Sequence, residues 1–329
     1  MALQVGERLA LEGGTKAVTL PFRDRWQEVS DDEVAAVTTL LEQVRAGTGG
    51  WYDVLDAFER EYAEFVGAKY ALAHSNGTAT LHAAIFAAGV KAGDEVIVPS
   101  YTWHASITPI LHCGGTPVYC DIDRATFTAD PADVERKVTS RTKAIVVTHV
   151  FGNPAKMDEL MAIAERHGLT VVEDASHAHG GSYDGKSVGT LGNVGCFSLQ
   201  ASKAVSAAEG GIATTDDPDL LDRMVILGHY GRIQKKRATD TFTDLHEIGL
   251  GVKYRANPLG IAMARAQLRR LPALNAKRRA WFAWLNDALA DLPGFRPQQV
   301  YPSLDYSRGG EACGEEVPEG LSWVSGCQV

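Results

Sequence analysis

Short, continuously apolar segments alternate with segments of helical periodicity over most of this 329-residue chain. The apolar segments that we predict to be strands are Glu95–Pro99, Thr116–Asp121, Lys143–Thr148, Leu169–Glu173 and Gly195–Leu199. A strand that is apolar at nearly every position has both faces covered, whereas a half-exposed strand alternates polar with apolar residues. Strands that alternate with helices favour a parallel sheet, because parallel neighbours need a crossover connection. The pattern therefore predicts an α/β fold with a mainly parallel sheet flanked by helices.

The helical segments have apolar residues that recur every three to four positions. They are Asp31–Ala46, Asp53–Val66, Thr78–Gly89, His104–Cys113, Met157–His167 and a mainly helical stretch from Arg255 to about Leu292. We expect an N-terminal arm over residues 1–25, a large domain over residues 26–255, and a partial C-terminal small domain with a tail over residues 256–329. Ser303–Val329 has little periodicity and is interpreted as a tail or a poorly formed end.

The overall composition argues against several classes of protein. The formal net charge is −9 and the pI is about 5.6, so a basic face that binds nucleic acid is not expected. No apolar run approaches the ~20 residues that span a bilayer, and the chain start lacks the apolar core of a signal peptide. The five cysteines have no CxxC spacing, which fits a reducing compartment. We expect a cytoplasmic protein that binds neither nucleic acid nor membrane.

Lys203 and Asp174 are the first candidates for chemistry. Asp174 follows the strand Leu169–Glu173, and Lys203 follows the strand Gly195–Leu199, ahead of the loop Glu209-Gly210-Gly211. A lysine whose ammonium group is desolvated becomes a nucleophile, and a carboxylate can hold a proton on a pyridine nitrogen. An isolated lysine is more often a surface residue, but this context favours the functional role. The role of Asp174 stays open at this point, because aspartate also caps helices at strand-to-helix turns.

The turn Ser75-Asn76-Gly77-Thr78 precedes a predicted helix. Its backbone N–H groups can bind a phosphate, and the helix dipole adds to the attraction. Thr78 could add a hydroxyl donor and Ser198 another, although a Gly-Thr pair before a helix is often only an N-cap. The turn is therefore a candidate anion site.

Trp103 comes soon after a predicted strand, where its indole could stack on a pyridine ring, although a tryptophan there is more often a core residue. His177 is close to Asp174 in the sequence and is interpreted as a residue that contacts the ring. A metal site made by His177 and His179 is not expected, because nothing nearby completes a ligand set. Together with Lys203, these residues predict a pyridoxal 5′-phosphate (PLP) site and amine chemistry at a carbonyl carbon.

These residues occur in an order that resembles the DegT/DnrJ/EryC1/StrS family of PLP-dependent sugar and cyclitol aminotransferases, which have the aspartate aminotransferase type I fold. The resemblance extends from about Leu20 to about Arg279. The segments that carry it are Ser75–His82, Gly93–Pro99, Pro117-Val118, Asp121–Asp123, Glu173–Ala175, His179-Gly180, Phe197-Ser198 and Lys203. Found together at these separations, they are highly specific.

The resemblance implies that Lys203 is the Schiff-base lysine, that Asp174 pairs with the pyridine nitrogen and that Trp103 stacks on the ring. His177 occupies the polar position beside the ring. The family's phosphate contacts are matched by Gly77, Thr78 and Ser198. The resemblance also implies a homodimer with shared active sites. The expected reaction moves an amino group from glutamate or glutamine to a small keto-sugar or keto-cyclitol, in aminosugar or antibiotic biosynthesis.

The chain departs from the family pattern in two places. Gly251–Arg255 has the sequence Gly-Val-Lys-Tyr-Arg where the family usually has Gly-x-Asn-Tyr-Arg. The family's asparagine reaches across the dimer to the phosphate of the partner's cofactor, so Lys253 either replaces it with a full charge or the contact is lost. In addition, nothing after about Pro302 resembles the rest of the family's small domain, which is therefore expected to be short or truncated.

Two other functions remain open. The first is a PLP-dependent dehydration or cyclisation on the same fold. Its dehydratase version is disfavoured by Lys203, because the family's sugar dehydratases have histidine in place of the lysine. The second is a non-catalytic regulatory homologue. The intact Lys203 and Asp174 speak against this function, whereas the short C-terminus and Lys253 speak for it.

Overall fold

The computed structural model describes residues 8, 10–15, 29–245, 247–291, 296 and 298–300. The 3₁₀ turn η1 (Ala10–Glu12) is assigned to a different unit of the chain from Val29–Gly310, which holds all the other elements. The predicted tail Ser303–Val329 and most of the predicted arm over residues 1–25 lie outside the described residues. The predicted domain division between residues 255 and 256 stays a prediction.

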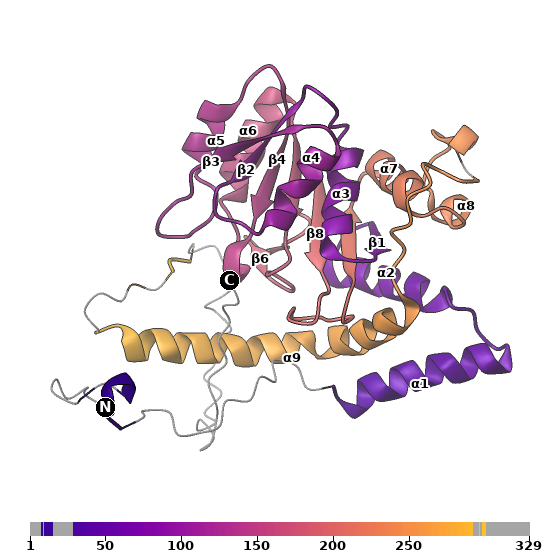
Figure 1. Cartoon of the computed structure of the whole chain (residues 1–329), viewed down its shortest axis with the longest axis horizontal. Coiled ribbons are helices and arrows are strands. Elements are labelled where there is room, and N and C mark those ends of the chain that lie inside the picture. Colours follow the sequence, from indigo (N-terminus) through magenta and orange to yellow (C-terminus); the bar gives the residue numbers. More distant parts are fainter. Residues whose placement is uncertain are drawn as a thin grey trace. The chain divides into compact units, whose positions relative to one another are not determined.

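A seven-stranded sheet forms the centre of the unit Val29–Gly310 (Figure 1). In spatial order its strands are β1 (Tyr70–His74), β9 (Gly211–Thr215), β8 (Val194–Ser198), β5 (Thr170–Asp174), β4 (Thr142–Thr148), β2 (Glu95–Pro99) and β3 (Thr116–Cys120). Neighbours from β8 to β3 are parallel, whereas β9 is antiparallel to both β1 and β8. The prediction of a mainly parallel sheet is confirmed. The sequence patterns did not predict β1, β9 or a small hairpin of β6 (Ser182–Tyr183) and β7 (Lys186–Ser187).

Helices cover both faces of this sheet (Figure 1). They are α1 (Asp31–Ala46), α2 (Asp53–Val66), α3 (Gly77–Ala87), α4 (Thr108–His112), α5 (Pro131–Lys137), α6 (Met157–His167), α7 (Pro218–Gly228), α8 (Ile233–Lys236) and α9 (Pro258–Leu289), with 3₁₀ turns η2 (His104–Ser106), η3 (Val150–Gly152) and η4 (Thr243–Leu245). On one face, α3 and α7 pack on residues such as Val172, whereas the adjacent Val171 packs towards α6 on the other. Side chains alternate between faces along a strand, which explains why strands buried on both faces are continuously apolar.

The bounds of α1 and α2 agree with the prediction. Helix α1 has a capping box, in which the N–H of Ser30 donates to Glu33 Oε2 at 2.7 Å, and it ends at Gly47 in the left-handed conformation. The predicted single helix His104–Cys113 is instead the turn η2 followed by the short α4. Pro109 explains the break, because it has no N–H to continue a helical hydrogen-bond ladder and it favours the first turn of a new helix.

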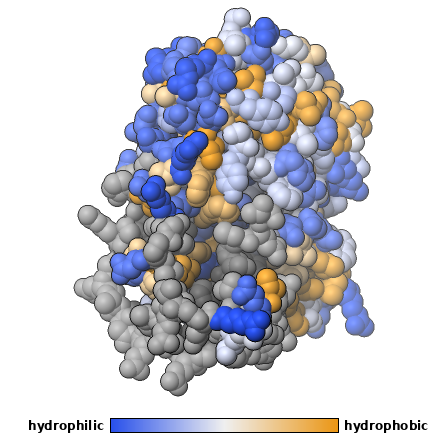
Figure 2. Space-filling view, turned by 60° about the vertical axis from the view of Figure 1, so that its left-hand side comes forward, coloured by the Kyte–Doolittle hydropathy of each residue, from blue (hydrophilic) through white to orange (hydrophobic). Residues whose placement is uncertain are grey.

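Helix α9 packs against α1 and α2, where it buries Leu268 and Leu271 and pairs Arg270 with Glu33. None of the helices in the described part of the chain has the length and apolar content needed to cross a membrane. Figure 2 shows one face of the molecule, with hydrophilic residues over much of its upper part and smaller hydrophobic areas among them.

Candidate active site

The carboxyl ends of four neighbouring strands lie at one edge of the sheet. In spatial order β8, β5, β4 and β2 end at Ser198, Asp174, Thr148 and Pro99. Thr148 is directly opposite Asp174 in the register of the sheet. Ligand sites of parallel α/β sheets form outside the carboxyl ends of the strands. This edge, with the loops that follow each strand, is therefore the candidate site.

Asp174 is a buried carboxylate, with 5% of its surface exposed. Its Oδ2 accepts a hydrogen bond from Ser106 Oγ at 2.5 Å, and its Oδ1 accepts one from Ser176 N–H at 3.2 Å. Thr102 Oγ1 lies 2.8 Å from both Ser106 Oγ and Thr148 Oγ1, so a chain of hydroxyl groups connects Asp174 to the loop after β2. The next described element after Asp174 is the short strand β6, which rules out a helix-capping role.

Lys203 lies in the connection between the antiparallel strands β8 and β9. The loop is closed by backbone hydrogen bonds from Leu199 to Gly210 and from Ala207 to Leu199, each at 2.8 Å. The side chain of Lys203 is half-buried, and burial lowers its pKa below the ordinary value, while nearby Asp174 acts in the opposite direction. Burial therefore gives this amine a larger neutral fraction than an exposed lysine has at the same pH.

The turn before α3 lies against the end of β8. Asn76 is the N-cap residue, since its Oδ1 accepts a hydrogen bond from Ala79 N–H at 2.7 Å. Gly77 is buried, and a Cβ at this position would lie 2.7 Å from the Cβ of Ser198. Thr78 is exposed in the first turn. The structure thus brings the predicted phosphate residues Gly77 and Ser198 into contact and leaves Thr78 accessible beside them.

Trp103 and His177 are both exposed side chains. Trp103 has 59% of its surface exposed, which excludes a core role, and its ring contacts only that of His104, at 4.6 Å between centroids, among the described aromatic side chains. The His177 ring is parallel to that of Phe151, and its Nδ1 accepts a 3.4 Å hydrogen bond from Phe151 N–H. Desolvation of the His177 ring lowers its pKa, Lys203 lowers it further, and Asp174 opposes both effects. His177, Lys203 and Asp174 therefore lie close enough to interact electrostatically.

A buried layer beneath these residues was not predicted. His179 Nε2 donates to the carbonyl of Ser198 at 2.9 Å, and its Nδ1 accepts from the Tyr62 hydroxyl at 3.0 Å. Burial lowers the pKa of His179 to about 4, so the ring is neutral at physiological pH. In the described part of the chain, no group of three or more His, Cys, Asp or Glu residues could hold a metal ion.

Glu173, next to Asp174, is a fully buried carboxylate. It accepts backbone hydrogen bonds from Gly189, Leu191 and Gly192 at 2.7–2.8 Å, and it lies 2.9 Å from Nε2 of the equally buried His149. The loop between β7 and β8, which contains Gly189 and Gly192, therefore wraps around the carboxylate of Glu173. These contacts fix the end of β5, and Asp174 with it.

Lys253 lies on a segment that follows α8 and η4 and precedes α9. It is exposed, and its backbone forms an antiparallel bridge with His229. The next residue, Tyr254, accepts a 2.6 Å backbone hydrogen bond from Ser75, so this segment borders the phosphate turn. Among the described residues, the Lys253 side chain has no hydrogen bond or ion pair.

The sheet arrangement and the chemistry of its carboxyl edge are those of PLP-dependent transferases. The desolvated amine of Lys203 suits an aldehyde, and the buried carboxylate of Asp174 suits a pyridine nitrogen. The exposed indole of Trp103 suits an aromatic ring. The sequence matches the DegT/DnrJ/EryC1/StrS aminotransferase family over residues 27–308, and the chain belongs to this family. PLP is the cofactor of the family.

Two similar crystal structures are those of aminotransferase-type enzymes. An aminotransferase from Psychrobacter cryohalolentis is 36% identical, with a TM-score of 0.74 over 82% of this chain and 69% of that one. A 3-amino-5-hydroxybenzoic acid (AHBA) synthase is 35% identical, with a TM-score of 0.77 over 86% of this chain and 72% of that one.

The similar structures also include a dehydratase. The E. coli GDP-4-keto-6-deoxy-D-mannose-3-dehydratase with bound hydrated PLP is 26% identical, with a TM-score of 0.74 over 83% of this chain and 74% of that one. The family therefore consists of PLP-dependent enzymes, mostly sugar aminotransferases together with related dehydratases, and its members are typically dimeric.

Proposed function

We propose that this protein is an aminotransferase that moves an amino group from glutamate or glutamine to a keto-sugar or keto-cyclitol, in aminosugar or antibiotic biosynthesis. The observation that carries the proposal is the half-buried Lys203, whose pKa is lowered, on the same sheet edge as the buried Asp174. When bound, PLP supplies an aldehyde that binds amines and a ring that withdraws electrons from the adjacent carbon.

Lys203 is proposed to act twice. Its neutral amine attaches the cofactor, and after the donor amine replaces it, the same amine moves a proton between the substrate carbon and C4′ of the cofactor. Asp174 keeps the pyridine nitrogen protonated. Ser106 and Ser176 hold the Asp174 carboxylate in one orientation through both of its oxygens.

The other predicted residues are proposed to bind the cofactor and to orient it. Gly77, at the N-terminus of α3, is proposed to present its backbone N–H to the phosphate, with hydroxyl donors from Thr78 and Ser198. Trp103 is proposed to stack on the pyridine ring, since its indole is exposed at the site edge. His177 is proposed to contact the ring from beside Asp174.

We infer a homodimer with shared active sites, in which Lys253 reaches the phosphate of the partner's cofactor. The exposure of Lys253 supports this, as does its lack of an ion pair among the described residues. Mass measurement in solution tests the dimer, and Lys253→Asn, which restores the family residue, tests the contact. A retained affinity for PLP is expected in Lys253→Asn and a reduced affinity in Lys253→Ala.

The function is tested with purified protein loaded with PLP. Glutamate or glutamine alone should convert the bound cofactor to pyridoxamine phosphate with release of the keto acid, and added keto-sugars or keto-cyclitols should restore PLP. Lys203→Ala should lose the visible absorption of the covalently bound cofactor and both half-reactions, whereas Lys186→Ala, on the exposed strand β7, should keep them. Full activity of Lys203→Ala would refute the proposal.

The same experiment separates the alternatives. A dehydratase or cyclase would consume the sugar without net transfer of nitrogen from the donor. A regulatory homologue would bind PLP and show no half-reaction with any donor.

A further inference from the structure

The guanidinium group of Arg255 contacts two tyrosine rings. Its central carbon is 5.2 Å from the ring centroid of Tyr52 and 5.3 Å from that of Tyr230. Tyr52 precedes α2 and Tyr230 follows α7, so the two rings come from distant parts of the sequence. Two such cation–π contacts restrict the position of the guanidinium group and leave its N–H groups as donors for a ligand.

Arg255 has no anionic partner in the described part of the chain. Its side chain forms no ion pair and no hydrogen bond there, although the residue is half-buried. Arginine is always charged, and a partly desolvated charge without a counter-ion is costly. A held but unpaired guanidinium is therefore typical of a site that receives its counter-ion from a ligand.

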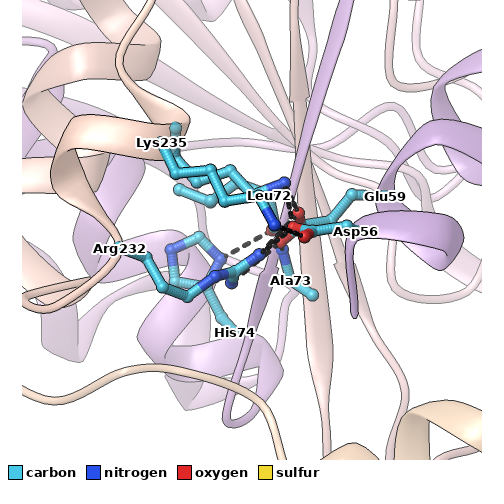
Figure 3. A network of polar contacts seen from close by, with 8 residues as sticks. Asp56, Glu59, Leu72, Ala73, His74, Arg232 and Lys235 are labelled. Atoms are coloured by element: carbon cyan, nitrogen blue, oxygen red, sulfur yellow. Dashed lines mark hydrogen bonds and ion pairs between the residues drawn. The ribbon is translucent and has the colours of Figure 1, made fainter. Parts of the chain in front are cut away.

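Two carboxylates of α2, the helix that follows Tyr52, are already neutralised. Figure 3 shows Asp56 and Glu59 from α2 facing Arg232 and Lys235. Arg232 is 2.9 Å from both carboxylates, and Lys236 pairs with both as well, at 2.6 Å from Asp56 and 2.5 Å from Glu59. Lys235 adds a further ion pair to Asp56.

Three cations thus share two carboxylates, which leaves an excess of positive charge that acts on His229 together with Arg255. The buried His229 responds to this field: burial is the main cause of its lowered pKa, and Arg232 and Arg255 both contribute. An anion that approaches Arg255 would therefore be attracted by the whole cluster.

The backbone of Arg255 borders the candidate active site. It forms an antiparallel bridge with His74, and the preceding carbonyl accepts the N–H of Ser75, the first residue of the phosphate turn. The chain then enters α9, where a Cβ at Gly260 would lie 2.4 Å from the carbonyl oxygen of Ala207, in the loop that holds Lys203. Arg255 therefore lies on the segment that joins the phosphate turn to the lysine loop.

We propose that Arg255 is the binding site for an oxyanion carried by a substrate, either a carboxylate or a phosphoryl group. The planar fork of a guanidinium binds both groups through two parallel hydrogen bonds. Under the proposed function, the carboxylate would come from the amino donor and the phosphoryl group from an activated sugar. The identity of the molecule rests on that function, but the existence of the oxyanion site does not.

The test measures binding without turnover, on the PLP-loaded protein. Glutarate, a dicarboxylate without an amino group, represents the carboxylate source, and inorganic pyrophosphate represents the phosphoryl source. Calorimetric titration gives each Kd for the wild type, Arg255→Gln, Arg255→Lys and Arg223→Gln. Arg223 is a matched control, because it is an exposed arginine of α7 whose guanidinium carbon lies 5.8 Å from the centroid of a single ring, that of Phe242.

We expect Arg255→Gln to raise the Kd of one probe by about tenfold or more, the effect of losing a charge-assisted hydrogen bond of roughly 1.5–3 kcal/mol. Arg255→Lys should show a smaller loss, because lysine keeps the charge but not the fork, and Arg223→Gln should bind as the wild type does. An effect on glutarate alone identifies a carboxylate site, and an effect on pyrophosphate alone a phosphoryl site.

The proposal is overturned if the wild type binds neither probe, or if Arg255→Gln binds both with the wild-type Kd. It is also overturned if Arg255→Gln loses only its affinity for PLP, since the guanidinium would then serve the cofactor. Thermal melting checks that each variant is folded. If Arg255→Gln does not fold, the comparison is made with Arg255→Lys instead. Arg255-dependent binding in a protein that shows no half-reaction with glutamate or glutamine would refute the proposed function and leave the oxyanion site standing.

Discussion

Ser106 Oγ lies 2.5 Å from Oδ2 of Asp174, although 68 positions separate the two residues in the sequence. The hydroxyl belongs to the turn η2, directly after Trp103, and it continues through Thr102 to Thr148 at the end of β4. A single chain of hydroxyl groups thus connects Asp174 to the loop that carries Trp103. The Asp174 carboxylate is proposed to pair with the pyridine nitrogen, and the Trp103 indole is proposed to stack on the ring. Under the proposed function, Ser106 is a positioning residue that acts through Asp174.

Ser106→Ala should destabilise the cofactor-free protein by about 1–3 kcal/mol, because it removes a donor from a buried carboxylate. The loss should become smaller when PLP is bound, since a protonated pyridine nitrogen supplies a new donor to Asp174. Urea unfolding with and without PLP measures both values. Thr148→Val, at the far end of the hydroxyl chain, should show a smaller loss that PLP does not change. Equal losses for Ser106→Ala in the two states would argue against the pairing of Asp174 with the cofactor.

The attachment of PLP to Lys203 should become faster as the pH rises, with a midpoint below the ordinary lysine pKa of 10.5. Burial favours the neutral amine, whereas the Asp174 carboxylate favours the ammonium. Asp174→Asn should therefore move the midpoint to a still lower pH. The rate of change in visible absorption after addition of PLP gives the pH profile. Nα-acetyl-lysine, which keeps its ε-amino group free, is the reference. A midpoint at or above 10.5, or an upward shift in Asp174→Asn, contradicts this account.

Gly77→Ala should weaken PLP binding and destabilise the fold. The added Cβ would lie 2.7 Å from the Cβ of Ser198, closer than real Cβ contacts allow, and overpacking of this kind costs about 1–3 kcal/mol. Gly50→Ala is the control, because its nearest neighbour is a flexible carboxylate oxygen of Asp53 at 3.4 Å. Thermal melting and a PLP titration of the two variants measure the effects. Wild-type affinity in Gly77→Ala would show that the turn can move away from β8 without loss.

Glu173→Gln should cost roughly 2–4 kcal/mol of stability, because an amide has one acceptor oxygen for a site in which two carboxylate oxygens are in use. Its NH₂ group would also face a backbone N–H donor. Glu165→Gln, an exposed change on α6, should stay within about 0.5 kcal/mol of the wild type. Urea denaturation of the two variants is the measurement, and a similar small loss in both would mean that the loop does not depend on the Glu173 charge.

Sequence patterns predicted the elements in which buried apolar residues follow a regular pattern within the element itself. The strand Glu95–Pro99 and the helix Met157–His167 have the predicted bounds. Strand β9 was missed: Gly211–Thr215 has glycine and threonine among its residues and pairs antiparallel with β1, which is far away in the sequence. The register of such pairs is decided by the neighbouring strands, and periodicity within one strand does not reveal it.

The same distinction holds at the candidate site. Lys203, Asp174 and Gly77 follow or precede predicted elements, and the order of parallel strands brings such positions to one edge. Nothing in the sequence predicts the contacts of Ser106 with Asp174 or of Tyr62 with His179, because a serine or a tyrosine has many possible partners. Their contacts depend on which strands are adjacent.

The sequence by itself determined the mainly parallel α/β sheet, the family and the cofactor, because continuous apolar strands and an ordered set of motif residues are local properties of the chain. Only the tertiary structure decided that Ser106 holds Asp174, that Glu173 anchors the loop of Gly189 and Gly192, and that Arg255 contacts Tyr52 and Tyr230 without an ion pair to any described residue. The physical reason is that a hydrogen bond or an unbalanced charge depends on which distant groups share a few ångströms of space. That proximity is set by the packing of the whole sheet and its helices.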